Sequence, residues 1–254
     1  DEKGTASLLM DYGPNRSHGH PDKLNIDLYA LDQKLIPDPG SIWYEQPLYR
    51  QWYRTSIAHN TLIVDEQDQK DCDAFQLVYG VGETISMQRA WTDQAYAGVA
   101  MDRSVFFTPN YVADTFGVFN RMPHKLDLAY HFVGELTTDL PLQPKAEPFT
   151  ANGYAQLANV KTAQTNDAWN ATIKTKNGPA RFVAAAGPST EVIVGDGHLR
   201  MERPPTIIQR RDNASNTVYG NAIDISGGSQ PYVKSVTTEG GVDVGYSLLN
   251  VVTP

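Results

Sequence analysis

Short runs of β-branched and aromatic residues, separated by turn residues, recur along the chain and limit its fold more than any other feature. Clear examples are the segments 23–31, 59–66, 111–119 and 191–197. Such runs are typical of strands, and no window shows the 3.6-residue apolar period of a long helix. The 20 glycines and 16 prolines suit many tight turns. We therefore expect an all-β fold, a two-layer antiparallel β-sandwich with little helix.

The length of 254 residues allows one large all-β domain or two small domains. No internal repeat or low-complexity tract divides the chain, and we expect a single domain over residues 1–254. The sequence has no initiator Met and begins with acidic residues in place of a signal-peptide n-region. We expect a mature chain or an excised fragment of a longer protein.

The charge balance and the cysteine count exclude several classes of partner and site. A net charge of −8 argues against a nucleic-acid surface, which needs clustered Lys and Arg. No apolar stretch approaches the roughly 20 residues that cross a bilayer, so we expect no membrane partner. Cys72 is the single cysteine in the sequence, which excludes an internal disulfide and a zinc site built from several thiolates.

Histidines and a carboxylate in the first sixty residues are candidate metal ligands. His18 and His20 are spaced i, i+2 and would point to the same side of an extended segment. Asp38 stands between two prolines, and His59 precedes an apolar strand. Two histidines and one carboxylate form a common zinc set that leaves a fourth position for water or substrate.

The expected hairpin complicates this set. A two-residue turn at Asp32-Gln33 would place Asp38 opposite Asp27, seven positions from His20. At about 3.3 Å per residue, this separation is too large for shared coordination. The ligands can meet only if Pro21, which cannot donate to a strand ladder, ends the strand and lets the chain fold back.

Each candidate also has an ordinary structural interpretation. The histidine pair suits a solvent-exposed or structurally hydrogen-bonded loop. Asp38 beside Pro39-Gly40 suits a turn, and His59 before Asn60 suits a strand-entry capping pair. Spacing alone does not decide between these interpretations and a metal site.

Taken together, the motifs resemble those of a known family. The segment "YGPNRSHGHPDKLNIDLYALDQKLIPDPG", followed by "WYRTSIAHNTLIVDE", is similar to the heparinase II/III-like polysaccharide lyases, which include alginate lyases. The resemblance is densest over residues 12–66 and continues loosely through "RSVFFTPNYVADTFGVFN" and "HKLDLAYHFVG". It implies a β-sandwich domain that follows an N-terminal (α/α) helical toroid, with the active site between them. The toroid is absent from this sequence.

The resemblance also assigns residues. His20, Asp38 and His59 match the family's ligands for Zn²⁺, and His18 matches the histidine that faces the substrate.

The aromatic loop "SIWYEQPLYRQW" corresponds to a region that carries an active-site Tyr in the alginate-lyase branch. Tyr44 is the nearest match, although it lies one position from the expected place, which holds Glu45, and Tyr49 is the fallback. We therefore assign catalysis to His18 and Tyr44, and substrate binding to Tyr49 and Arg16. The neighbouring Trp43 is expected to pack within its loop.

The implied reaction is β-elimination at a uronic acid of an acidic polysaccharide or oligosaccharide. A base removes the C5 proton, the 4-linked sugar leaves, and positioned donors stabilise the developing enolate-like charge. The zinc would be structural, because it would position the loop that carries His18. Residues 14–60 contain five basic and five acidic side chains, which favours an alginate-like polyuronate over sulfated heparin. The resemblance implies a periplasmic or secreted bacterial enzyme whose activity needs the toroid.

Two alternatives remain open from the residues. A cupin-type metal enzyme also uses H-x-H, a carboxylate and a later His. However, Asn25 and Ile26 stand where its Glu is expected, and His59 lies nineteen residues beyond Gly40. The second alternative is a non-catalytic β-sandwich that binds or supports carbohydrate and holds a structural zinc.

Overall fold

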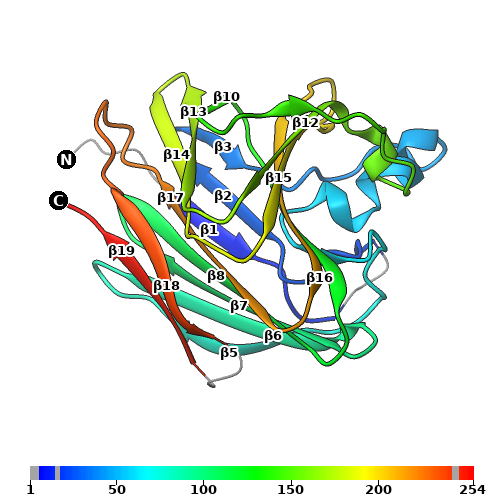
Figure 1. Ribbon diagram of the computed structural model, residues 1–254, viewed down its shortest axis with the longest axis horizontal. Coiled ribbons are helices and arrows are strands. Elements are labelled where there is room, and N and C mark those ends of the chain that lie inside the picture. The colour runs from blue at the N-terminus through cyan, green and yellow to red at the C-terminus, as the bar shows by residue number, and fades with distance from the viewer. Residues whose placement is uncertain (1–5, 15–17, 242–245) are drawn as a thin grey trace.

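Antiparallel sheets carry nearly all of the regular structure in the computed structural model, which describes residues 6–14, 18–241 and 246–254 (Figure 1). Two large sheets form the layers of a sandwich, and a three-stranded sheet and a hairpin flank them. The described helical segments are single turns, η1 (Tyr49–Tyr53), η2 (Ser56–Ala58) and η3 (Tyr154–Gln156). The prediction of an all-β, two-layer antiparallel sandwich with little helix is confirmed.

The sheets order their strands as follows. The eight-stranded sheet runs β10 (Glu135–Thr138), β13 (Trp169–Thr175), β14 (Gly178–Ala184), β17 (Thr217–Asp224), β8 (Tyr111–Asn120), β7 (Val99–Phe107), β6 (Ser86–Tyr96), β5 (Phe75–Gly80). The six-stranded sheet runs β11 (Gln143–Pro144), β12 (Ala158–Thr165), β15 (Thr190–Asp196), β16 (Pro205–Ala214), β9 (His124–His131), β4 (Leu62–Val64). The three-stranded sheet comprises β1 (Ser7–Met10), β2 (Ile26–Ala30) and β3 (Gln33–Ile36), and the hairpin comprises β18 (Ser235–Gly241) and β19 (Tyr246–Val252).

The core lies between the two large sheets. Phe116 and Val118 of β8 are fully buried and alternate with partly exposed neighbours, as expected for a strand with one face inside. Across the sandwich they belong to the same apolar cluster as Leu128 and Tyr130 of β9. Complete burial of such a side chain contributes roughly 1.5–3 kcal/mol, which makes this inter-sheet layer the main source of stability.

A buried ion pair joins this core to the N-terminal strands. Arg103 of β7 and Asp114 of β8 are both fully buried, with Arg103 Nη2 2.6 Å from Asp114 Oδ2. Tyr130 donates its hydroxyl to the same carboxylate oxygen at 2.7 Å. Arg103 Nη1 donates to the carbonyls of Leu24 at 2.6 Å and Asn60 at 2.5 Å. One side chain thus joins the segments that follow His20 and His59, two of the three predicted metal ligands.

The predicted turn between β2 and β3 is wrong by one residue. Ala30 pairs with Gln33, so the turn residues are Leu31 and Asp32, with φ of 53° and 55°. Left-handed backbone at both positions matches the right-handed strand twist of tight hairpins. An irregularity between Leu28 and Tyr29 shifts the register further. Within the described residues, no helix is long and apolar enough to span a membrane.

Candidate active site and metal centre

The chain folds back after His20 and brings the predicted ligands together. Asn25 donates its backbone N–H to the carbonyl of Asp22 at 2.9 Å, and Leu24, inside this turn, has a φ of 63°. The Asn25 side chain then donates to Asp38 Oδ2 at 2.8 Å. In the hairpin expected from the sequence, His20 and Asp38 were too far apart to share a metal ion. The turn that begins directly after Pro21 removes this separation.

Asn60 ties three segments of the site to one another. Its side-chain amide donates to the carbonyls of Ile26 and Pro37, both at 2.9 Å, and its backbone N–H donates to Asn25 Oδ1 at 2.8 Å. Because Asn60 directly follows His59, these bonds fix the position of that histidine against the loop after β3. Asn60, which from the sequence also suited a strand-entry capping pair with His59, is a buried residue that connects these segments.

His59 is fully buried between two carboxylates. Its Nδ1 lies 2.9 Å from Asp38 Oδ2 and 3.4 Å from Asp22 Oδ2, and its Nε2 faces the carbonyl of Tyr53 at 3.3 Å. Burial alone would lower the pKa of His59, but the charges of Asp22 and Asp38 outweigh it and raise the pKa to about 9. The site therefore strongly favours a positive charge at this position.

The same burial shifts the pKa values of the other members of the cluster. Burial and the charge of His59 lower the pKa of His20 to about 4, so this imidazole is neutral and can act as a ligand. Burial raises the pKa of Asp22 to about 7. For Asp38, burial is outweighed by the hydrogen bond from His59, which holds its pKa below the ordinary value.

These side chains fit a zinc ion. The ligand atoms of His20, Asp22 and His59 all lie within 4.8 Å of one another, and Asp38 contacts His59 directly. Imidazole nitrogens and carboxylate oxygens are usual donors to Zn²⁺. One oxygen of Asp22, Oδ1, is buried and has no hydrogen-bond partner among the described residues. A cation beside it would remove this unfavourable burial.

His18 and the tyrosines lie at the mouth of the same site. His18 Nδ1 is 2.7 Å from the hydroxyl of Tyr44, and the Tyr44 ring lies 4.6 Å from that of Tyr49 at the ring centroids. The Tyr49 ring is 6.4 Å from His20. The structure thus brings together four residues that the sequence placed in one site. Arg16, predicted to bind substrate, lies outside the described residues.

A cavity of about 470 Å³ opens over this cluster. Its lining includes His18, His20 and Tyr44, together with the carboxylates Asp22 and Asp38. Neutral and charged groups that can move protons therefore line one space that is large enough for a sugar unit. The expectation that Trp43 packs within its loop is wrong, because 79% of its surface is exposed.

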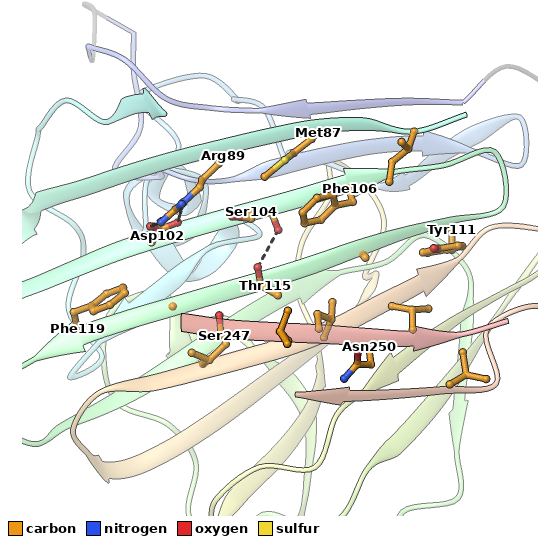
Figure 2. Close-up of a pocket in the computed structure, with 18 residues that line it drawn as sticks. Met87, Arg89, Asp102, Ser104, Phe106, Tyr111, Thr115, Phe119, Ser247 and Asn250 are labelled. Atoms are coloured by element: carbon orange, nitrogen blue, oxygen red, sulfur yellow. Dashed lines mark hydrogen bonds and ion pairs between the residues drawn. The ribbon is translucent and has the colours of Figure 1, made fainter. Parts of the chain in front are cut away.

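A larger groove, of about 940 Å³, lies elsewhere, between the eight-stranded sheet and β19. Figure 2 shows its side chains on β6, β7, β8 and β19. The Arg89 guanidinium in this groove donates three hydrogen bonds to Asp102, from Nε and Nη2, the shortest at 2.6 Å. The remaining lining is largely apolar, with Met87 and Phe106 among its members. The lining of this groove contains no histidine, in contrast to that of the first cavity.

Three polar residues at or near the site have no role assigned from the sequence, namely Asp22, Asn60 and Arg103. Asp22 follows His20 by two positions, so the i, i+2 spacing that flagged the histidines could have flagged it. Arg103 carries no local signal, because it reaches Leu24 across 79 positions.

Comparisons with known proteins agree with this fold. An alginate lyase of Stenotrophomonas maltophilia is 25% identical over 271 aligned positions, covering 91% of this chain and 36% of the relative. An exo-oligoalginate lyase of Saccharophagus degradans is 28% identical over 193 positions, covering 64% of this chain and 26% of the relative. The chain thus spans about a third or less of the length of these relatives.

Solved structures match nearly the whole chain. A heparan sulfate lyase of Pedobacter heparinus superposes with a TM-score of 0.70 at 14% identity, covering 97% of this chain and 39% of that one. A heparinase III structure gives 0.62 at 13% identity. At these identities the likeness shows the fold. The sequence model described as heparinase II/III-like, C-terminal, matches residues 2–202. The chain therefore belongs to the heparinase II/III-like family and carries its C-terminal domain.

Proposed function

We propose that this chain is the β-sandwich part of a polysaccharide lyase that cleaves uronic-acid-containing polysaccharide by β-elimination. The carrying observation is the contact between His18 and Tyr44 at the mouth of a cavity lined by His20 and Asp38. Proton transfer at a sugar carbon needs a hydroxyl or imidazole at the substrate, supported by a fixed polar environment. Family membership favours this function over the cupin and the non-catalytic alternatives.

In the proposed reaction, the Tyr44 oxygen gives its proton to His18 and takes the C5 proton of a bound uronate. The electron pair of the C5–H bond forms a C4=C5 double bond, and the C4–O bond to the leaving sugar breaks. The departing oxygen then receives a proton from an acid in the remainder of the parent enzyme. Tyr49, whose ring lies beside that of Tyr44 at an interplanar angle of 41°, would position that ring and contact the sugar.

Zn²⁺ would be held by His20, Asp38 and His59, where it would act as a structural cross-link. It would join the loop that carries His18 to the loop after β3 and to the segment before β4. The N–H of His59 Nε2, which faces the carbonyl of Tyr53, would fix the ring orientation. In this role the ion positions His18, and the protein side chains carry out the proton transfer.

The proposal also includes a substrate class, a partner domain and a cellular location. The relatives include lyases of alginate and of heparin or heparan sulfate by name, and the balanced charge of residues 14–60 favours an alginate-like polyuronate. The relatives are longer than this chain. A preceding helical toroid of the same enzyme would complete the active site. Acidic polysaccharides occur outside the cytoplasm, which supports a periplasmic or secreted enzyme.

The direct test uses the full-length protein that contains this chain. Polymannuronate, polyguluronate and heparan sulfate are each offered, and the ultraviolet absorbance of the new double bond is followed. The proposal expects unsaturated product from at least one polyuronate and loss of product in Tyr44→Phe. Binding of oligouronates without unsaturated product would instead support the non-catalytic alternative.

A further inference from the structure

The resemblance assigns three zinc ligands, His20, Asp38 and His59. This assignment gives Asp22 no role and leaves its burial unexplained. Its side chain is 8% exposed, and Oδ1 accepts no hydrogen bond from the described residues. Asp38 differs, because its Oδ2 accepts from Asn25 at 2.8 Å and its Oδ1 from the Gly40 N–H at 2.7 Å. A buried carboxylate is costly unless it is paired or bound to a metal. Asp22 is the member of the cluster with a buried oxygen, Oδ1, that no described residue satisfies.

The donor spacing fits a single ion. Zinc bonds of about 2.0–2.1 Å in a tetrahedral site place neighbouring donor atoms about 3.3 Å apart. His59 Nδ1 lies 3.4 Å from Asp22 Oδ2 and 2.9 Å from Asp38 Oδ2. His20 offers a ligand atom within 4.8 Å of those of Asp22 and His59. Asp22 is thus spaced from His59 as one zinc ligand is from the next.

We propose that Asp22 is a fourth protein ligand, which closes the zinc shell together with His20, Asp38 and His59. Four protein ligands are typical of structural zinc sites, whereas catalytic sites keep one position open. Two carboxylates and two neutral imidazoles would also balance the charge of the ion. A closed shell excludes direct contact between the metal and a uronate carboxylate. This inference rests on the proposed zinc and is independent of lyase activity.

The test measures zinc affinity by competition with a chromophoric chelator. Asp22→Asn keeps the shape of the side chain and removes its charge, and we expect it to weaken zinc binding more than about 100-fold. Asp27→Asn is the matched control, because Asp27 lines the same cavity but pairs with Lys34 at 3.2 Å. Equal affinity in the two variants would overturn the fourth ligand. Failure of the unaltered protein to bind zinc would overturn both the zinc site and this inference.

A second variant covers the case in which Asp22→Asn does not fold. Asp22→Cys places a thiol at the same position, and Co²⁺ bound by a thiolate gives an intense ultraviolet charge-transfer band. We expect this band in the variant and not in the unaltered protein, whose one cysteine, Cys72, lies in a separate buried position. A Co²⁺-loaded variant without the band would show that position 22 does not reach the metal.

A different observation points to a second sugar-binding position. A groove of about 720 Å³ adjoins the cavity over the metal cluster, and Tyr44 lines both. Trp43 and Arg200 also line this groove. The Trp43 loop is held by a hydrogen bond from the Gln46 N–H to the Trp43 carbonyl. The Arg200 turn is held by a hydrogen bond from the Arg200 N–H to the Tyr53 hydroxyl. The groove therefore presents an exposed indole and a guanidinium next to the His18–Tyr44 pair.

We infer that this groove binds the neighbouring sugar of a uronate chain, with its ring on Trp43 and its carboxylate toward Arg200. Arginine pairs well with carboxylates, and the flat indole offers an apolar surface to a sugar ring. Because the cavity and the groove meet at Tyr44, one polyuronate chain can extend from the cavity into the groove. This inference rests on the proposed uronate substrate.

Calorimetric titration of the full-length protein with polyuronate-derived disaccharide and tetrasaccharide tests the second position. Trp43→Ala should weaken tetrasaccharide binding about tenfold, which corresponds to 1.4 kcal/mol, and leave disaccharide binding unchanged. Met122→Ala removes another exposed apolar side chain, outside the groove, as control. Equal effects of the two variants would overturn the second position. Length-dependent loss in Trp43→Ala without any unsaturated product would keep this position and reject the lyase reaction.

Discussion

The hydroxyl of Tyr44 lies 2.7 Å from Nδ1 of His18, across 26 positions of sequence. Neither side chain is buried, and both line the cavity above the cluster of His20, Asp22 and His59. A phenol and an imidazole in this contact can pass a proton between them while one of them faces a substrate. The pair is therefore the centre of the proposed elimination, and the buried residues below it serve to hold it in place.

Removal of the Tyr44 hydroxyl should abolish most of the turnover. In Tyr44→Phe we expect kcat to fall about 10²- to 10⁴-fold, the usual range for a group that transfers a proton. The measurement is the initial rate of double-bond formation by the full-length protein on polyuronate. Tyr49→Phe is the matched control, because it removes a hydroxyl from the neighbouring aromatic ring, and its kcat should change far less. A Tyr44→Phe enzyme within twofold of the unaltered kcat would reject this assignment.

The two members of the pair should also be coupled. If Tyr44 gives its proton to His18, the double variant Tyr44→Phe, His18→Gln should be little slower than Tyr44→Phe alone. Residues that act through one interaction are strongly non-additive. Rates for the four proteins of this cycle provide the coupling free energy. Fully additive effects would mean that His18 contacts the substrate independently of Tyr44.

Metal removal should loosen the site and lower stability. Because an ion that binds only the folded state stabilises it, zinc at 100 to 1,000 times its Kd would add roughly 3–4 kcal/mol. We expect about one zinc per chain by elemental analysis, its loss in His59→Ala, and a lower Tm after chelation. An unchanged Tm after complete removal of the metal would contradict the structural role.

Much of the fold, but less of the site, could be predicted from the sequence. Period-two runs such as that of β8 identified the strands, because the alternation depends on local burial. The placement of Asp38 opposite Asp27 was wrong because the turn falls at Leu31-Asp32 and the strand pairing is irregular at Leu28. Residue types and spacing suggested His20, Asp38 and His59 as metal ligands, and the family resemblance added the roles of His18 and Tyr44. The role of Arg103 could not be predicted, because it arises from contacts between residues far apart in sequence.

Arg103 should be the most costly of the charged residues to replace. In Arg103→Met, Asp114 would remain buried without its partner, and two carbonyls near the metal ligands would lose a donor. Breaking one side of a buried ion pair costs about 3–5 kcal/mol. Arg89→Met breaks a similar double hydrogen bond to Asp102, but the Arg89 side chain is 43% exposed, and we expect about 1 kcal/mol or less. Denaturant unfolding of both variants gives the comparison, and equal losses would contradict it.

His131 should make the domain sensitive to acid. Its Nε2–H donates to the carbonyl of Ile57 at 2.9 Å, and its Nδ1 accepts from the Thr206 hydroxyl at 2.8 Å, so the buried ring is neutral. Burial lowers the pKa of His131 from 6.5 to about 4. Between these values the unfolded chain binds a proton that the folded chain does not. The free energy of unfolding should therefore fall as the pH falls from 6.5 to 4, by roughly 3 kcal/mol from this residue.

The residue-specific measurement is the NMR titration of the His131 ring in the folded protein. We expect its carbon and proton shifts to stay constant from pH 8 down to about 5 and to move only near 4, because protonation of Nδ1 would break the bond from Thr206. Denaturant unfolding at the same pH values should show the matching loss of stability, and His131→Gln should reduce that slope. A ring that titrates near 6.5 in the folded state would show that burial does not hold it neutral, and the predicted acid sensitivity would then have no source in this residue.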